Sequence, residues 1–346
     1  MKKILFPLLC WIAISFTSCE KALMEKPVDN NPVSTFEYLW NKVDQQYAFF
    51  DIKGIDWDSV HEVYRPMVTD DMDDESLFDV CAAMLNTLRD GHTNLVSGFN
   101  VSRNDTVYYK MIAEKNVNTD VVMLNYLTLG YHSTGSFSHN SIRDGRVAYI
   151  RYSSFESDIT DNALDYLLER YKDCAGMILD LRQNGGGSVA NIPMLLSIFD
   201  NHGQQLYRTQ IKTGPKHDEF TEMKTVCADS IASDTAHPRR PYTKPFAVLI
   251  DRGSYSATSF FSICTQAYDN IKLFGDYSGG GLGLPNGGEL PNGWTYRFSI
   301  TRTIALDGNN YENGVPPDVR VLLDPEATAQ GVDNVIETAA DWILSK

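Results

Sequence analysis

Cysteine is sparse in the body of this 346-residue sequence. Four cysteines follow the N-terminal region, and no two of them form a C-x-x-C pair: Cys81, Cys174, Cys227 and Cys264. Zinc-binding and thiol-redox motifs of that type are therefore excluded. Cys81 and Cys264 fall within apolar helical patterns, which predicts buried thiols, while the spacing leaves any disulfide pairing open.

Basic residues are also fewer than acidic residues. Lys and Arg total 30 against 45 Asp and Glu, which gives a formal net charge of −15. A nucleic-acid-binding protein needs a basic face, so this acidity argues against nucleic acid as a partner. Beyond the N-terminal segment, no apolar run approaches membrane-spanning length and no internal repeat is present.

The N-terminal residues form the pattern of an export signal. Lys2 and Lys3 precede an apolar run over residues 4–14 that is too short to span a membrane, and the small residues of "SFTSC" follow. We predict a signal peptide over residues 1–18. Because Cys19 follows the small residues directly, the pattern resembles a lipoprotein box, which predicts a lipid-anchored protein of the bacterial cell envelope. An ordinary cleaved signal with an incidental cysteine is the alternative.

Helical periodicity dominates the next region. Residues 19–34 are polar and contain several prolines and asparagines, which suits a flexible tether. From residue 35 onward, apolar side chains recur at the i, i+3, i+4 and i+7 spacing of a helix, and Gly91 ends the last such pattern. We therefore predict a small helical subdomain over residues 35–95.

Strands alternate with helices in the rest of the chain. Residues 96–145 are predicted to form an insertion with "TVYYKMIA" and "VVMLNYLTLG" as strands and "YHSTGSFSHNSIRDG" as a loop, and no peptide-docking PDZ module is recognisable there. Residues 146–346 alternate strands with amphipathic helices of about a dozen residues, which predicts an α/β core with ligands at the carboxyl ends of parallel strands. The segments "WTYRFSITRTIAL" and "VRVLLD" are expected to be strands, and 332–344 a final helix.

One strand-to-helix turn carries three consecutive glycines. The segment "ILDLRQNGGGSV" (178–189) lacks the Lys-Ser/Thr of a Walker loop and the spacing of a dinucleotide fingerprint. The three glycines, Gly185 to Gly187, expose main-chain N–H groups where a helix begins. This predicts an anion site whose backbone a substrate carbonyl can approach. We expect Asp180 and Arg182 to pair and to stabilise the turn.

A second strand-to-helix turn is rich in hydroxyl groups. In "LIDRGSYSATSFF" (249–261) a strand gives way through a glycine to a helix whose first turn contains serine and threonine. A serine presented beside the glycine-rich turn would combine a nucleophile with fixed N–H donors, the pairing that acyl transfer needs. The G-x-S-x-G of α/β-hydrolases is absent. Ser256 or Ser254 could instead be the N-cap of the helix.

A serine nucleophile requires a base, and seven histidines are available. His92 differs from the others because it follows a helix-ending glycine in "DGHTNL", at the junction of the helical subdomain and the core, from which an interdomain cleft can be reached. An ordinary loop histidine is the alternative. The seven are His61, His92, His132, His139, His202, His217 and His237.

Four separated motifs occur in one order: "ILDLRQNGGG", an S-x-S-A-x-S turn, "IKLFGDYSGGG" and "ENGVPPDV". Together they resemble the C-terminal-processing peptidase superfamily of tail-specific and tricorn-type serine proteases. "LWNKVDQQYAFFDIKGIDWDSV" and "LRDGHTNL" resemble the tricorn-type branch in particular. The resemblance implies a ClpP/crotonase-like βα core with a mixed sheet, peptide or protein substrates, and no metal or organic cofactor.

The resemblance also assigns a nucleophile and an oxyanion hole. The family's nucleophile falls on Ser256, and the N–H donors fall on Ala257 and on Gly186 or Gly187. In the processing-peptidase branch the base is a lysine within a G-K-G, and Gly281 stands in its place here. A Ser–Lys dyad is therefore not expected.

In the tricorn-type branch the base is a histidine and its orienting group is a glutamate shortly before G-V-x-P-D. Those positions match His92 and Glu312. A carboxylate on the far nitrogen of a histidine fixes its tautomer and stabilises the imidazolium. The chain departs from relatives at Ser259, where many carry an acidic residue, and at Gly91, where tricorn has a serine. Taken alone, Glu312 could be one solvated carboxylate among many.

Two functions follow from the resemblance. The first is an exported, lipid-anchored serine peptidase with a Ser-His-Glu constellation. The second is a non-catalytic protein that binds peptides or small ligands on the same scaffold, because the superfamily also includes a retinoid carrier and a fold does not fix an activity. Loss of the lysine favours the second function, whereas retention of serine, histidine and glutamate favours the first.

Overall fold

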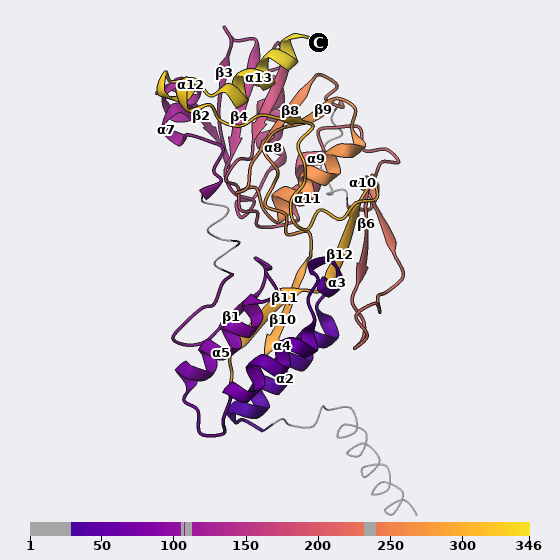
Figure 1. The fold of residues 1–346 in the computed structure, drawn as a ribbon. Helices are drawn as coiled ribbons and strands as arrows, with labels where there is room; N and C mark the ends of the chain where they lie inside the picture. The colour runs from indigo at the N-terminus through magenta and orange to yellow at the C-terminus, as the bar shows by residue number, and fades with distance from the viewer. Residues whose placement is uncertain (1–28, 105–106, 108–112, 232–239) are drawn as a thin grey trace, which may run out of the picture.

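The computed structural model describes residues 29–104, 107, 113–231 and 240–346. The predicted signal peptide, Cys19 and much of the predicted tether lie outside the described residues. Figure 1 shows an α/β body that carries the C-terminus and, below it, a smaller lobe that contains the N-terminal helices. Within the described part, no helix is long and apolar enough to cross a membrane.

A mixed sheet forms the centre of the body. Its strands are β2 (His132–Thr134), β3 (Phe137–Ile142), β4 (Val147–Tyr152), β5 (Gly176–Asp180), β8 (Phe246–Ile250), β9 (Ile271–Gly275) and β13 (Val319–Arg320). They follow the order β13-β9-β8-β5-β4-β3-β2, parallel from β13 to β4 and antiparallel from β4 to β2. Every residue of β5 and β8 is buried, as expected for parallel strands covered on both faces. The predicted α/β core with a mixed sheet is confirmed.

Helices cover both faces of this sheet. On one face lie α8 (Asp161–Arg170), α9 (Asn191–Leu196) and α11 (Ala257–Cys264). On the other face lie α7 (Thr119–Val121), η2 (Val122–Leu127) and α13 (Asn334–Leu344). Because successive strand residues point to opposite faces, Leu179 and Val248 enter the first core while Ile178 and Ala247 enter the second. The carboxyl ends of β5 and β8 then lead into the two turns described above.

The lobe combines helices from the N-terminal part of the chain with strands from its C-terminal part. Its helices are α2 (Pro32–Gln46), α3 (Phe50–Lys53), α4 (Trp57–Tyr64), the 3-10 turn η1 (Arg65–Met67) and α5 (Asp74–Asn86). They pack on an antiparallel sheet of β1 (Asn94–Val96), β11 (Thr295–Ser299) and β10 (Pro285–Glu289), as Figure 1 shows. The boundary at residue 95 stays a prediction, and the core of the lobe also draws on residues 285–299.

The helices of the lobe begin where the sequence supplies caps. The side chains of Asn31, Asp56 and Asp73 each accept a hydrogen bond from the backbone N–H three residues ahead. The periodic apolar side chains that predicted these helices, such as Phe36 and Leu39, are fully buried. The helical prediction is therefore confirmed for this region.

A further antiparallel sheet connects the lobe and the body. Its strands β12 (Thr301–Ala305), β6 (Gln205–Ile211) and β7 (Lys224–Cys227) lie in the order β12-β6-β7. β12 follows β11 almost at once, so a single segment runs from the lobe into this sheet. The remaining short elements are α10 (Ala228–Ile231), η3 (Thr265–Ala267) and α12 (Pro325–Ala329).

Residues 121–145 differ from the sequence prediction. "VVMLNYLTLG", predicted as a strand, contains the π-helix η2, because a short apolar run fits a buried helix as well as a strand. "YHSTGSFSHNSIRDG", predicted as a loop, forms the β2–β3 hairpin, whose polar residues hide the alternation of a strand. Most of "TVYYKMIA" lies outside the described residues.

Candidate active site

The turn between β8 and α11 presents Ser256. This residue has φ 56° and ψ −119°, which non-glycine residues seldom adopt, and its side chain makes no capping bond to the helix. Ser254 is used inside the turn, where its Oγ accepts the N–H of Asp251 at 3.0 Å and donates to the carbonyl of Leu181 at 2.8 Å. Neither serine is a side-chain N-cap of α11, and the hydroxyl of Ser256 is left for another partner.

That partner is His92. Its Nε2 lies 2.9 Å from Ser256 Oγ, although the two residues are 164 positions apart in the chain. His92 is 6% exposed in the loop between α5 and β1, and Arg297 Nε donates to its carbonyl at 3.3 Å. Burial lowers the pKa of His92, and Asp90 opposes that shift. The imidazole is therefore neutral near neutral pH, the state in which it can accept a proton from serine.

The glycine-rich turn lies against Ser256. Gly186 has φ 94°, and a Cβ there would lie 2.8 Å from Ser256 Cβ and 2.9 Å from the N of Ala257. Gly187 has φ 139°, and a Cβ there would lie 2.3 Å from the backbone of the neighbouring loop. Both positions therefore require glycine. The N–H of Gly186 donates to Asn184 Oδ1 at 3.0 Å, whereas the Gly187 N–H makes no hydrogen bond to the described residues.

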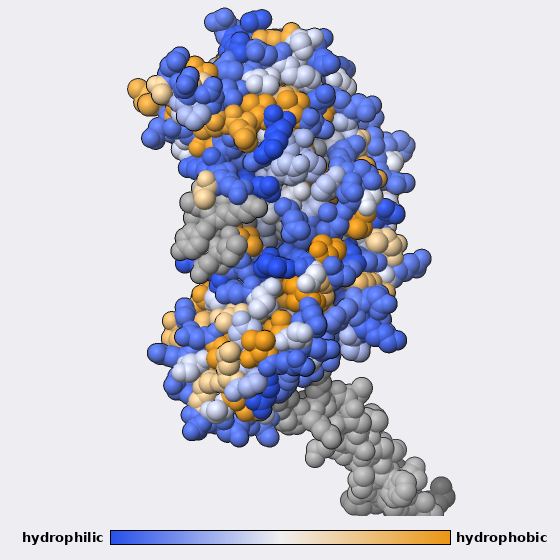
Figure 2. Space-filling view, in the orientation of Figure 1, coloured by the Kyte–Doolittle hydropathy of each residue, from blue (hydrophilic) through white to orange (hydrophobic). Residues whose placement is uncertain are grey.

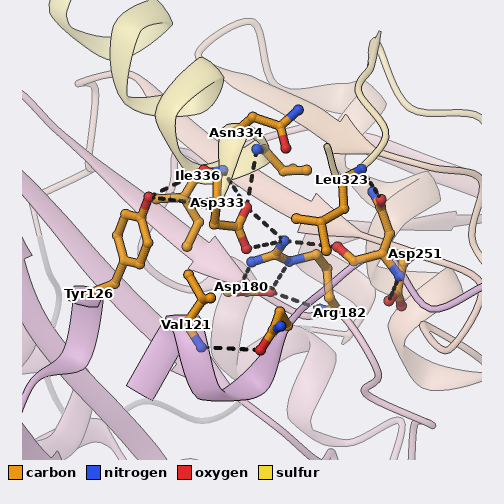
Figure 3. Close-up of polar contacts among 12 residues, drawn as sticks. Val121, Tyr126, Asp180, Arg182, Asp251, Leu323, Asp333, Asn334 and Ile336 are labelled. Carbon is orange, nitrogen blue, oxygen red and sulfur yellow. Dashed lines mark hydrogen bonds and ion pairs between the residues drawn. The ribbon is translucent and has the colours of Figure 1, made fainter. Parts of the chain in front are cut away.

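A buried ionic network supports the glycine-rich turn (Figure 3). Arg182 Nη2 donates to Asp180 Oδ2 at 2.7 Å, and Arg182 Nη1 donates to Asp333 Oδ2 at 2.9 Å. Asp333 also caps α13 by accepting the N–H of Ile336 at 3.1 Å. Although burial opposes the shift, Arg182 lowers the pKa of Asp180 to about 2. The predicted Asp180–Arg182 pair is confirmed, and it links the turn to the C-terminal helix.

Glu312 is buried close to the site and has partners of its own. Its Oε2 accepts the N–H groups of Leu282 at 2.8 Å and Gly283 at 3.2 Å. Lys53 Nζ, from α3 of the lobe, lies 3.6 Å from its Oε1. Glu312 therefore joins a loop of the body to the helical lobe.

The structure does not place Glu312 in contact with His92. The hydrogen bonds of the described residues include none between these two side chains, and the buried Nδ1 of His92 has no hydrogen-bond partner there. Burial raises the pKa of Glu312 to about 8, and Asp90 adds to that rise while Lys53 opposes it. The carboxyl group of Glu312 is thus largely neutral at neutral pH.

Tyr255 fills the space that a lysine base would need. Its ring centroid lies 5.0 Å from that of His92. Gly281 has φ 74°, and a Cβ there would lie 2.3 Å from the Tyr255 ring, while a Cβ at Gly91 would lie 2.7 Å from the Tyr255 hydroxyl. The two glycines that depart from relatives are therefore explained by one tyrosine. Sequence reasoning missed Tyr255, and those glycines were the available signal.

A cavity of about 370 Å³ opens beside the Ser256–His92 pair. Its lining includes Lys53 from the lobe together with Arg252, Tyr255 and Glu312 from the body. Among the residues that the structure describes, no group of three or more His, Cys, Asp or Glu side chains is placed to hold a metal ion. The cavity lies between the lobe and the body, and it is lined by Gly91 and Tyr255, which directly precede His92 and Ser256 in the chain.

Three of the four cysteines that the structure describes are buried. Cys81, Cys174 and Cys264 are buried, and Cys227 is partly buried. The predicted buried thiols at Cys81 and Cys264 are confirmed, and burial raises the pKa of Cys81 to about 12.

Comparisons with known proteins find peptidases that are similar to this chain. The chain is 25% identical over 198 residues to the carboxy-terminal processing protease CtpA of Bacillus subtilis, a match that covers 56% of this chain and 39% of that protease. The chain thus spans well under half the length of the curated relative it matches. Residues 30–86 match the tricorn protease C1 domain.

Solved structures extend the likeness to the whole fold. A protein from Parabacteroides merdae described as a candidate peptidase is 35% identical, with a TM-score of 0.82, over 91% of this chain and 98% of that one. The tricorn protease shares the fold at 14% identity and a TM-score of 0.53, over 91% of this chain and 36% of that one. Residues 146–321 match peptidase family S41. The chain belongs to peptidase family S41.

Proposed function

We propose that the protein is a serine peptidase in which Ser256 is the nucleophile and His92 the general base. The observation that carries the proposal is the 2.9 Å contact between Ser256 Oγ and His92 Nε2 at a strained strand-to-helix turn. In acylation, Ser256 Oγ bonds to the carbonyl carbon of the scissile peptide and its proton passes to His92 Nε2. That proton then passes to the leaving amine, and a water molecule repeats the steps to release the acyl group.

The negative charge that develops on the carbonyl oxygen requires fixed donors. We assign this role to the N–H of Ala257 and to the glycine-rich turn at Gly186 and Gly187, whose backbone lies against Ser256. Because the Gly186 N–H already donates to a side chain, Gly187 is the freer donor of the two. Glu312 completes the proposed constellation by fixing the loop that borders His92.

The proposed substrates are peptides or proteins, and the proposed cellular location of the protein is the cell envelope. Ser256 and His92 need no metal or organic cofactor for acyl transfer. Lys2, Lys3 and the small residues before Cys19 support export and lipidation of Cys19. Fractionation of cells that express Cys19→Ser tests this anchor: release from the membrane fraction is expected, and unchanged membrane association contradicts it.

Labelling with a fluorophosphonate probe tests the nucleophile. Wild-type protein should label, Ser256→Ala should not, and His92→Ala should label roughly a hundredfold or more slowly because the base is lost. Ser153→Ala, which removes an exposed serine from a neighbouring loop, is the matched control and should label like wild type. Full labelling of folded Ser256→Ala would exclude this nucleophile.

The same experiment decides the binding-protein alternative. One observation favours that alternative: among the described residues, no carboxylate forms a hydrogen bond with the buried Nδ1 of His92. A wild-type protein that folds but neither labels nor cleaves a peptide library would support a non-catalytic role.

A further inference from the structure

Two buried polar atoms next to the Ser256–His92 pair lack hydrogen-bond partners within the described residues. They are Nδ1 of His92 and Oδ2 of Asp90, which belong to side chains two positions apart. Asp90 is 1% exposed and His92 6% exposed. Burial of an unpaired polar group is costly, so such a pair beside a candidate base calls for an explanation.

The other oxygen of Asp90 is bonded to the base itself. Asp90 Oδ1 accepts the backbone N–H of His92 at 2.8 Å, and the Asp90 carbonyl accepts the N–H of Thr93 at 3.1 Å. These bonds close a tight turn directly after Arg89, which has φ 50°. The Asp90 carboxylate is therefore fixed to the main chain of His92.

Glu312 is less suited to supply negative charge to His92. Its Oε2 is occupied by two backbone N–H groups, and Lys53 lies on its Oε1 side. Asp90 is the main acidic group that raises the pKa of His92 against burial, and it also raises the pKa of Glu312. Because the pKa of Glu312 is raised to about 8, its carboxyl group is largely neutral near neutral pH.

We propose that Asp90 is a positioning residue for His92: it fixes the backbone of the base through Oδ1 and supplies the negative charge that stabilises the imidazolium. The inference rests on the proposed peptidase function. When Ser256 Oγ attacks, the proton moves from Ser256 to His92 Nε2 and none moves to Asp90. Glu312 acts on His92 indirectly, through hydrogen bonds to the loop that lies beside the base.

Other charged and titratable groups also face Asp90 and His92, and the test leaves these groups unchanged. Arg297 and Lys53 both lower the pKa of His92. The hydroxyl groups of Tyr47 and Tyr255 face Asp90, and after burial Asp90 is the next cause that raises their pKa. A substitution of Asp90 therefore changes one charge within an otherwise fixed set.

The kinetic test compares Asp90→Asn with Asp90→Ala. The asparagine keeps an oxygen for the His92 N–H and removes the charge, whereas the alanine removes both. We expect the acidic limb of the pH profile of kcat/KM, which reports the base, to move to lower pH in Asp90→Asn, with a loss of roughly ten- to a hundredfold on the plateau. Asp90→Ala should lose more. Asp73→Asn, at an exposed helix cap in the same lobe, is the control and should keep the wild-type profile.

A titration of His92 by NMR in the Ser256→Ala background separates this inference from the peptidase proposal. Adding Asp90→Asn should lower the pKa of His92, and adding Glu312→Gln should shift it less. If the wild type proves inactive but the pKa moves as expected, the proposed function fails and the Asp90 inference holds. An unmoved pKa in folded Asp90→Asn, or a larger shift with Glu312→Gln, would overturn the role of Asp90.

Discussion

Ser256 lies in the body, on the turn between strand β8 and helix α11, whereas His92 lies in a loop of the lobe. The turn around Ser256 is tightly bonded: Ser254, Thr258 and Ser259 are buried, and each hydroxyl has a hydrogen-bond partner. The surroundings of His92 are assembled from α3, the loop after α5 and the loop before β10. Among the described residues, three buried polar atoms there lack a hydrogen-bond partner: Asp90 Oδ2, His92 Nδ1 and Thr93 Oγ1.

The nucleophile and the base therefore differ in what holds them in place. A strand-to-helix turn on a buried sheet is fixed by local sequence and by the core beneath it. The base depends on contacts between the lobe and the rest of the molecule, such as Lys53 Nζ to Glu312 Oε1 at 3.6 Å and Arg302 Nη2 to the Ala48 carbonyl at 2.7 Å. We therefore expect the nucleophile to tolerate loosening of the lobe and the base to respond to it. On the face seen in the space-filling view, the surface continues from the lobe into the body (Figure 2).

The largest effect is expected at the nucleophile turn. Gly186→Ala places a Cβ 2.6 Å from the carbonyl oxygen of Tyr255 at φ 94°, so the turn must move away from Ser256. We expect a loss of roughly a hundred- to a thousandfold in kcat/KM because oxyanion donors are displaced. Gly185→Ala is the matched control, since no atom lies within 4 Å of its Cβ, and its loss should be far smaller. Equal losses in the two variants would show that the close approach at Gly186 is not what matters.

An intermediate effect is expected from loosening the lobe. Phe298→Ala removes a ring that is 1% exposed in the core of the lobe, and Phe199→Ala removes one that is 4% exposed beside the main sheet. Each should cost about 3–5 kcal/mol of unfolding free energy. In the folded protein, only Phe298→Ala should reduce kcat/KM, by roughly tenfold or more, because it displaces the base. Chemical unfolding gives the unfolding free energy, and kinetics on the same samples give kcat/KM. Equal losses of kcat/KM in the two variants would show that the base does not depend on the lobe more than the nucleophile does.

The smallest effect is expected from the titration of Glu312. Its folded pKa of about 8 lies above the ordinary glutamate value of 4.5, so the folded state binds the proton more tightly than the unfolded state. Stability from this group is complete below the unfolded pKa and is lost as pH rises through the folded pKa. Between about pH 6.5 and 8.5 the loss amounts to about 2 kcal/mol. Glu312→Gln should abolish this part of the pH dependence in urea unfolding, whereas the exposed Glu289→Gln should keep it. If Glu312→Gln keeps the wild-type dependence of unfolding free energy on pH, another group is responsible for that dependence.

The nucleophile side could be derived from the sequence because its signals are local. Three glycines after a buried apolar run, and serines after a second one, predict two turns at the carboxyl edge of a parallel sheet. Ser256 stands in one of those turns and Gly186 in the other, side by side. The predicted α/β core and the Asp180–Arg182 pair followed from the same local patterns.

The base side could be derived only in part. His92 was recognisable from a helix-ending glycine, but nothing local indicates that residues 285–299 return to the lobe and complete its core. The sequence also gave no sign that Glu312 bonds to Leu282 and Gly283, because such partners depend on the path of two distant loops. Asp90 had a usable signal, since an aspartate two positions before a buried residue often accepts that residue's N–H.

The return of residues 285–299 to the lobe has a consequence for biosynthesis. A nascent chain that has released only its N-terminal helices has no strands on which to bury Phe36 or Leu85, because β10 and β11 are synthesised long after those helices. The imidazole therefore reaches the hydroxyl only after residues 285–299 have been synthesised. An unfinished copy therefore lacks the Ser256–His92 contact on which the proposed activity depends.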